Sequence, residues 1–252
     1  NKTAENSSWD MDMLSMELND IDMDMSGFGF EMPELDDGGY FGDERERTYN
    51  EYNLKDYDSR RVSGPYDLPV LKRCCVAPRT LIGFNYVLNT RAKPSGGVHF
   101  FLDDYQFERI WAQPYRYMEK LREYEAVCTP DFSLYMDMPM AMKIWNVYRS
   151  RLIGQLYQDA GLNVIPTLQW AGPETYSWGF DGIESGGTVC VSTVGVMREK
   201  EALEAFYEGF SAAMNKVRPK TVILYGAELD VATSAEVIKI KPRSFNKRED
   251  VV

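Results

Sequence analysis

Apolar residues follow two different patterns along residues 55–252, and these patterns alternate. Short, nearly continuous apolar runs are typical of buried strands, whereas apolar residues that recur every three or four positions are typical of helices. The runs predict strands at residues 80–87, 97–103, 126–129, 163–170, 188–193, 221–226 and 236–240. The helical pattern covers residues 105–124, 139–160 and 199–217.

Single residues set the expected ends of these helices. Pro114 should divide the first helical segment into two short helices, because proline breaks a helix interior. Asp137 is expected to cap the second helix, and Gly161 stands where a glycine ends one. The predicted apolar face of that second helix consists of Ala141, Ile144, Trp145, Tyr148, Leu152 and Leu156.

Apolar strands that are separated by helices predict an α/β fold with parallel strands covered by helices. Two architectures remain open. We favour a small or incomplete barrel of the TIM type, and the alternative is an open, doubly wound sheet. The order of the strands cannot be determined from the sequence of one chain.

Residues 1–54 form an acidic, Met-rich leader that differs from the rest of the chain. They hold fifteen of the 39 acidic residues but only three of the 28 basic residues, so residues 55–252 are nearly neutral. Apolar residues at helical spacing predict one short amphipathic helix near residues 9–21, and glycines interrupt the pattern afterwards. We interpret the leader as a flexible linker before an α/β domain at 55–252. Alternatively, residues 9–21 dock on a protein partner.

The composition of the chain indicates the cellular compartment in which the protein acts. No apolar run approaches the roughly 20 residues of a membrane span, and no signal peptide is visible. The four cysteines form no Cys-x-x-Cys pair and there is one histidine, so a zinc site of the usual spacing is not indicated. This pattern favours a reducing, cytoplasmic location without membrane contact.

Carboxylates follow several of the predicted strands. In parallel α/β folds, ligands bind at the carboxyl ends of the strands. The candidate catalytic residues are therefore Asp103, Asp104, Asp131 and Glu228. Asp103 shares a strand face with His99, and Asp103 with Asp131 would suit Mg²⁺. Two such carboxylates can also act as a general acid and a general base when their environments give them different pKa values. Alternatively, each of these acids, taken alone, caps a helix or stabilises a turn.

Other residues near the strand ends are candidates for binding a substrate. Aromatic rings stack on bases or sugars, arginine meets phosphate, and hydroxyl groups donate hydrogen bonds. These candidates are Tyr135, Arg149, Trp170, Trp178, Ser192 and Thr193. We expect His99 to be a core histidine, and Cys128 and Cys190 to be buried packing.

Two resemblances add context. The segment NKTAENSSWD (1–10), with Leu14 and Glu17-Leu18, resembles the tail of a ParB/sulfiredoxin-like domain; the match covers residues 1–20 and contains none of that family's catalytic motif. It implies that this chain is the C-terminal part of a longer protein that acts on DNA. The segments VHFFLDDYQFE (98–108), TPDFSLY (129–135), IWNVYR (144–149), VIPT (164–167) and VSTVG (191–195) resemble a domain-of-unknown-function family (number 4417) of phages and mobile elements.

Two functional hypotheses follow from these observations. In the first, the protein is a phage or mobile-element enzyme that acts on a nucleic acid or nucleotide through the carboxylates and aromatic residues at the strand ends. In the second, the same residues form a non-catalytic binding module, and the leader is a docking arm. The sequence leaves the choice between enzyme and binding module open.

Overall fold

The computed structural model describes residues 49–87, 95–198 and 200–242. The chain divides into two units, Asn1–Glu44 and Arg45–Val252, and all described residues belong to the second unit. Part of the predicted leader, residues 49–54, is therefore described with the α/β domain. Asn53 is buried there, and its Nδ2 donates a hydrogen bond to the carbonyl of Trp111 at 2.8 Å. The predicted helix at residues 9–21 lies outside the described residues.

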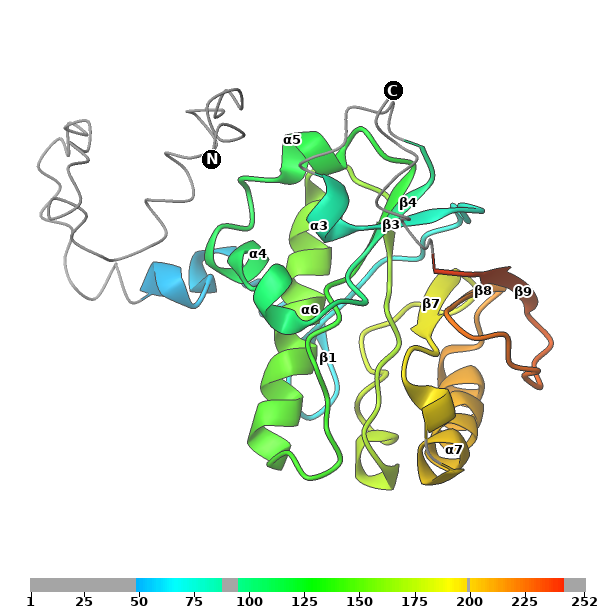
Figure 1. Ribbon diagram of the computed structural model, residues 1–252. Coiled ribbons are helices and arrows are strands. Elements are labelled where there is room, and N and C mark those ends of the chain that lie inside the picture. The colour runs from blue at the N-terminus through cyan, green and yellow to red at the C-terminus, as the bar shows by residue number, and fades with distance from the viewer. Residues whose placement is uncertain (1–48, 88–94, 199, 243–252) are drawn as a thin grey trace, which may run out of the picture. The chain divides into compact units, whose positions relative to one another are not determined.

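Parallel strands form the centre of this unit (Figure 1). Within the described ranges, β3 (Leu81–Gly83), β4 (Gly97–His99), β5 (Ala126–Cys128) and β6 (Val164–Ile165) make one sheet. A second sheet contains β7 (Thr188–Ser192), β8 (Thr221–Tyr225) and β9 (Glu236–Ile240). Thr167 and Cys190 form a parallel bridge between the two sheets, so the strands follow one another in chain order. The predicted parallel α/β fold is confirmed.

The two sheets face a common interior. The ring of His99, at the end of β4, lies 4.2 Å from the ring of Tyr225, at the end of β8. One apolar cluster combines residues from both sheets: Leu81, Ala126, Cys128, Ile165, Cys190, Ile223, Tyr225, Ile238 and Ile240. The described residues contain no hydrogen-bonded pair between β3 and β9, so a closed barrel is not formed.

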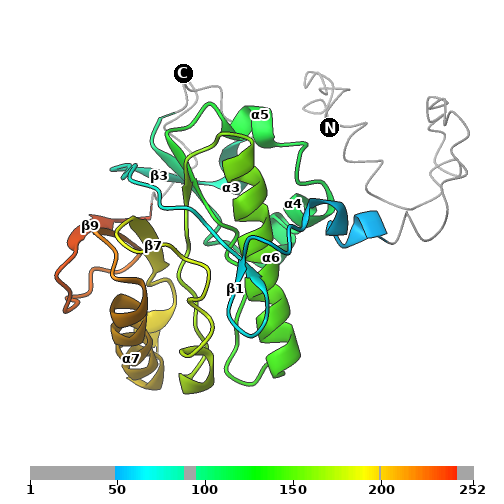
Figure 2. The same cartoon turned by 180° about the vertical axis from the view of Figure 1, so that it is seen from behind.

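Helices cover the outer faces of the sheets (Figures 1 and 2). The first sheet packs against α3 (Phe84–Val87), α4 (Arg109–Ala112), α5 (Met118–Leu121) and α6 (Met140–Asp159). The second sheet packs against α7 (Lys200–Val217) through side chains such as Phe206 and Phe210. The interior cluster consists of strand residues, Phe101 and residues near Cys74, with no member from these helices. These helices therefore cover only the outer face of each sheet, whereas a doubly wound sheet has helices on both faces.

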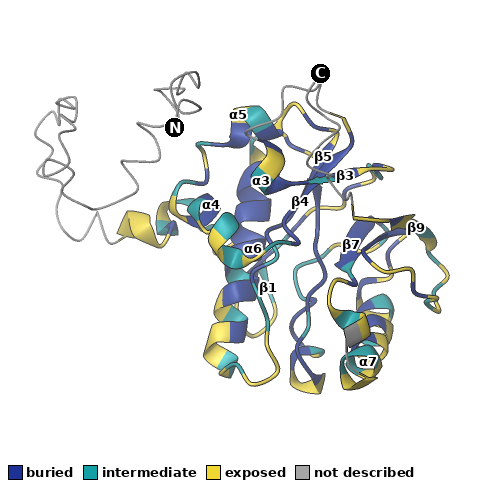
Figure 3. Ribbon diagram, in the orientation of Figure 1, coloured by how far each residue is buried: buried dark blue, intermediate teal, exposed yellow. Residues whose placement is uncertain are grey.

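Much of helix α6 is buried, as its dark blue stretches in Figure 3 show. Its second half is buried almost continuously, because the hairpin of β1 (Val62–Ser63) and β2 (Leu68–Pro69) covers it from outside. Ala141 of the predicted apolar face is exposed, whereas Trp145 is 36% exposed and its ring packs 5.1 Å from that of Trp111. Asp137 does not cap the helix, since Pro139 stands at the N-cap position. Gly161 does end it, with a φ of 86° that favours glycine.

The observed strands are mostly shorter than the predicted runs. After β3 the chain turns into α3, and the segment after β6 continues without a regular strand. Short 3-10 helices lie in the connecting segments: η2 (Leu54–Asp56), η3 (Asp104–Gln106), η4 (Pro173–Thr175) and η5 (Val196–Arg198). Pro114 does separate two short helices, α4 and α5, as predicted. None of the helices described is both long and apolar enough to cross a membrane.

Candidate functional site

The loop that follows β5 is held from two sides at the carboxyl ends of the strands. The Asp104 carboxylate accepts hydrogen bonds from the Ser133 N–H at 3.1 Å and from its hydroxyl at 2.8 Å. On the other side, the Gln169 Nε2 donates to the carbonyl of Phe132 at 2.7 Å. Asp131 directly precedes these two contacts. We call Asp104, Asp131, Ser133 and Gln169 the strand-end cluster.

Asp131 has the most perturbed acidity in this cluster. Removal of water from its carboxyl group raises the pKa to about 7, and the negative charge of Asp104 contributes in the same direction. A hydrogen bond with Gln169 offsets part of this increase. The residue as a whole is only partly buried, although its carboxyl group is desolvated. A carboxyl group with this pKa exchanges a proton readily near neutral pH.

Aromatic rings fill the interior beneath the cluster. The rings of Phe101 and Tyr225 lie 5.2 Å apart, and His99 packs between strands beside both. His99 accepts a hydrogen bond at Nδ1 from the Phe101 N–H, and burial lowers its pKa to about 3. The imidazole therefore stays neutral near pH 7. It is a core histidine, as the sequence predicts.

Two cysteine thiols lie in the same interior. Cys128 and Cys190 are buried, on β5 and β7. Burial raises the pKa of the Cys190 thiol well above its ordinary value, and its neighbours Cys128 and Asp131 add to the increase. A protonated thiol is a poor nucleophile. The interpretation of Cys190 as packing therefore agrees with its surroundings, and Cys128 is buried as predicted.

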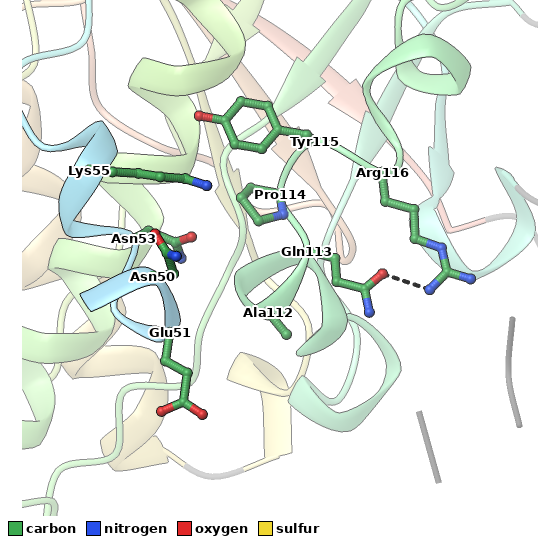
Figure 4. A pocket seen from close by; sticks show the side chains of 9 residues that line it. All are labelled: Asn50, Glu51, Asn53, Lys55, Ala112, Gln113, Pro114, Tyr115 and Arg116. Atoms are coloured by element: carbon green, nitrogen blue, oxygen red, sulfur yellow. Dashed lines mark hydrogen bonds between the residues drawn. The ribbon is translucent and has the colours of Figure 1, made fainter. Parts of the chain in front are cut away.

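A separate cavity lies beside helix α4 (Figure 4). It has a volume of about 460 Å³ and is lined by residues of two segments, 50–55 and 112–116. The Tyr115 hydroxyl donates a hydrogen bond to Asp56 at its edge, and burial together with this carboxylate raises the tyrosine pKa. None of its lining residues comes from the strand-end cluster. The cavity and the strand-end cluster are therefore separate places on the unit.

Comparison with known proteins identifies the family. Residues 60–241 match the model of a domain of unknown function (DUF4417), which is more than half of the chain. This chain belongs to the DUF4417 family. The DUF4417 match does not extend to residues 1–20, which also lie outside the described residues, so the ParB-like resemblance stays a prediction.

Two phage proteins are similar to this DUF4417 chain. The Gene 1 protein of Mycobacterium phage L5 is 40% identical over 166 residues, which cover 65% of this chain and 72% of the phage protein. The Gene 1 protein of Mycobacterium phage D29 is 39% identical over 166 residues, which cover 65% of this chain and 62% of that protein. The chain therefore spans less than two thirds of the D29 protein. No solved structure matches this chain.

The structure separates the four candidate acids. Asp104 and Asp131 both belong to the strand-end cluster, where the charge of Asp104 acts on Asp131. Asp103 is exposed, and its carboxylate accepts a hydrogen bond from Gln106 at 3.4 Å. Glu228 is exposed as well and pairs with Lys241 at 3.2 Å. Among the residues described, no three His, Cys, Asp or Glu side chains are grouped to hold a metal ion.

Arg149 holds elements of the fold together. Its guanidinium is buried, pairs with Glu108 and donates to Asn146 Oδ1 at 2.7 Å. It also lies 3.8 Å from the centre of the Phe132 ring. These contacts join α6 to the loop after β5, and they occupy the group that we expected to meet phosphate. Arg149 therefore has a structural role, because it holds the loop after β5 against α6.

The two candidate tryptophans pack within the domain. The Trp170 Nε1 donates to the carbonyl of Ala205 on α7 at 3.2 Å. Trp178 is 3% exposed and packs with Leu68 and Val147. Both rings are therefore used to hold elements together. Tyr135, in contrast, is 60% exposed and lies two residues after Ser133.

The two candidate hydroxyl residues lie at the end of β7. The Ser192 Oγ accepts a hydrogen bond from the Val194 N–H at 3.2 Å. The Thr193 hydroxyl lies within hydrogen-bonding distance of the carbonyls of Tyr225 and Ala227. Thr193 thus joins the ends of β7 and β8, while Ser192 is only partly buried.

Ser133 and Gln169 lie at the ends of predicted strands, where residues were expected to converge, but neither was selected as a candidate site residue. Ser133 lies in a segment that resembles the DUF4417 family, and its hydroxyl provides no signal of its own. Gln169 stands in the predicted fourth strand, where a polar side chain among apolar residues was the available signal. Serine and glutamine side chains do not titrate near neutral pH, so a choice of candidates based on acidic and basic residues does not include them.

Proposed function

We propose that this DUF4417 protein is an enzyme that acts on a nucleotide or nucleic acid by acid–base chemistry, with Asp131 as the general acid and base. The observation that carries the proposal is the desolvated Asp131 carboxyl beside Asp104, at the ends of parallel strands. Enzymes use such environments to bring a carboxyl pKa near the pH of the reaction.

The two carboxylates have different surroundings and therefore different roles. Asp104 is fixed by the N–H and the hydroxyl of Ser133, so it is held as a hydrogen-bond acceptor. Asp131 gains and loses the proton, and the charge of Asp104 helps to keep its pKa near 7. Paired carboxylates in different environments are a recurrent acid–base arrangement.

Exposed tyrosines support a ligand with a flat ring. Tyr105 follows Asp104 directly and is 80% exposed, and Tyr135 is 60% exposed. Phenol rings in such positions stack on a base or sugar without reading its sequence. The similar proteins from two mycobacteriophages are consistent with a role in phage biology.

The Asp131→Asn variant tests the proposal. The wild-type protein is first screened by ligand-observed NMR and product analysis against nucleosides, nucleotides and short oligonucleotides. For a substrate found in this way, D131N should bind with similar affinity and turn over roughly 10²–10⁴ times more slowly. The wild-type rate should change with pH around 7, following Asp131. The matched control D103N should retain the wild-type rate.

Three results would contradict the proposal. Wild-type turnover by D131N would exclude Asp131 as the acid–base group. An equal loss in D103N would show that the effect is not specific to the strand-end cluster. The absence of binding by every nucleoside, nucleotide and oligonucleotide would exclude the proposed substrate class.

A non-catalytic binding module is the second candidate function. It is favoured by the exposed side chains of Tyr105 and Tyr135, which can bind a ring without any reaction. In that case D131N and the wild-type protein would bind the same ligand equally well, and neither would release a product. Substitution of Tyr135 by Ala would then weaken binding by about 1–3 kcal/mol, the usual contribution of one stacked base.

A further inference from the structure

A second cavity lies at the amino ends of β8 and β9. It has a volume of about 390 Å³ and lies between the last turns of α7, the turn before β8 and the loop before β9. Its polar lining residues are Ser211, Asn215, Arg218, Thr233 and Ser234. Among the described residues that line it, none carries a carboxylate. The strand-end cluster lies at the carboxyl ends of the parallel strands, so this cavity is a separate place on the unit.

The positive charge of Arg218 is available to a ligand in this cavity. Other cations of the same region have carboxylate partners, since Lys216 pairs with Asp181 at 2.8 Å and Lys239 pairs with Asp230 at 3.0 Å. The guanidinium of Arg218 forms no ion pair or hydrogen bond with any residue that the structure describes, and the residue is exposed. A guanidinium group binds two phosphate oxygens through a pair of parallel N–H donors.

The backbone at Arg218 has a conformation that disfavours arginine. Its φ is 48°, and the other non-glycine residues with a positive φ in the described ranges are Asn53 and Asp67, whose short side chains tolerate this region. Arg218 directly follows α7, where glycine is the usual residue. Two hydrogen bonds fix the position, because its N–H donates to the Met214 carbonyl and its carbonyl accepts from the Gly186 N–H, both at 3.0 Å. Strained residues that their surroundings hold in place are typical of functional positions.

Hydroxyl and amide groups supply further hydrogen-bond donors around the cavity. Ser211 and Asn215 lie one turn apart on α7, and both are exposed. The Thr233 Oγ1 accepts a hydrogen bond from the Ala235 N–H at 3.1 Å, which leaves its own O–H able to donate. Hydroxyl and amide side chains are, after arginine and lysine, common donors to phosphate oxygens.

We propose that this cavity binds the phosphate group of a small phosphorylated molecule, with Arg218 as its principal contact. The proposal goes beyond the proposed function, because no residue of the strand-end cluster takes part. One unpaired cation surrounded by neutral donors suits a single phosphate monoester. A nucleic-acid backbone, in contrast, is normally bound by several basic groups.

NMR titration of the ¹⁵N-labelled full-length protein tests the site. Inorganic phosphate and ribose 5-phosphate are added at constant ionic strength, and the backbone N–H signals of Thr233 and Ser234 report binding in every variant. The wild type should show saturable shifts, and Arg218→Gly should weaken binding at least about tenfold. The matched control is Lys220→Ala, which removes an exposed cation close in sequence that does not line the cavity, and it should bind like the wild type.

The Arg218→Gly variant also separates ligand binding from folding. Glycine adopts a φ of 48° without strain, so without phosphate R218G should raise the Tm by about 2–4 °C. A more stable variant that no longer binds phosphate would support the proposal. A lower Tm in R218G would show that the arginine serves the fold and would overturn its assignment to a ligand.

Three binding results would also overturn the proposal. These are equal binding by R218G and the wild type, an equal loss in Lys220→Ala, and wild-type shifts with a single-stranded oligonucleotide but with neither small phosphate. D131N should bind both small phosphates like the wild type, because the strand-end cluster is a separate site. Failure of the acid–base proposal would therefore leave this inference standing, and the reverse also holds.

Discussion

Asp131 obtains its unusual acidity from its surroundings. A carboxyl group in an unfolded chain has a pKa of about 3.9, whereas desolvation and the charge of Asp104 raise the pKa of Asp131 to about 7. Between these values the folded protein binds more protons than the unfolded chain. The contribution of Asp131 to the free energy of unfolding is therefore greatest below pH 4, and it is lost as the pH rises to 7.

The loss of this stabilisation with rising pH predicts the effect of Asp131→Asn on stability. At pH 5 the folded protein holds Asp131 mostly protonated, and Asn resembles that form. At pH 8 the wild-type carboxylate is charged and desolvated, and the difference between the two pKa values corresponds to at most about 4 kcal/mol. D131N should therefore raise the Tm by several degrees at this pH. Calorimetry at both pH values measures the difference. An equal change at pH 5 and pH 8, or the same increase in D103N, would contradict the assigned environment.

The positions of Asp103 and Asp104 show how far single residues could be predicted. Because side chains alternate between the two faces of a strand, His99 and Phe101 were expected on one face. The structure places both in the interior. Beyond His99 the strand ends, and the Leu102 N–H donates back to the carbonyl of Phe100 at 2.8 Å. Alternation no longer applies after this turn, so Asp103 faces solvent and Asp104 contacts Ser133. Where a strand ends depends on backbone hydrogen bonds that the sequence pattern does not reveal.

Helix α6 shows, for a whole element, what the sequence pattern predicts and what it does not. Its bounds were predicted closely, since Gly161 ends it and apolar residues recur along it. Its buried polar residues were not predicted. Arg151 is 1% exposed, and its Nη2 donates to the carbonyl of Gly179 at 3.0 Å. A pattern that assigns charged residues to the surface cannot find an arginine whose partners are carbonyl groups of a distant loop.

The segment at residues 49–56 is an element that sequence reasoning assigned mostly to the leader. Asn53 has a left-handed backbone, with a φ of 52°, and its buried side chain bonds to Trp111. Asn53→Gly keeps this backbone accessible but removes the bond, so it should lower the free energy of unfolding by about 1–3 kcal/mol. Denaturant unfolding measures the change.

The matched control for this prediction is Asn50→Gly. Asn50 is exposed, and its backbone carbonyl, not its side chain, accepts the hydrogen bond from the Asn53 N–H. The control should therefore change stability by less than Asn53→Gly. If both variants unfold at the same denaturant concentration as the wild type, the segment contributes nothing to the stability of the α/β unit.

At the scale of the whole molecule, the sequence predicts parallel strands but not how their sheets meet. The bridge between Thr167 and Cys190 joins the sheets, and the rings of His99 and Tyr225 meet across the interior. These contacts link residues far apart in the chain, so local patterns carry no information about them. The same arrangement brings the loops after β4, β5 and β6 together, and this convergence creates the strand-end cluster.

The pKa of Asp131 is the central quantity in this account, and NMR can measure it directly. The ¹³C resonance of the Asp131 carboxyl group is followed from pH 4 to pH 9 and assigned by its absence in D131N. We predict a midpoint near 7, and a lower midpoint in D104N because one negative charge is removed. A midpoint near 4, unchanged in D104N, would contradict the account.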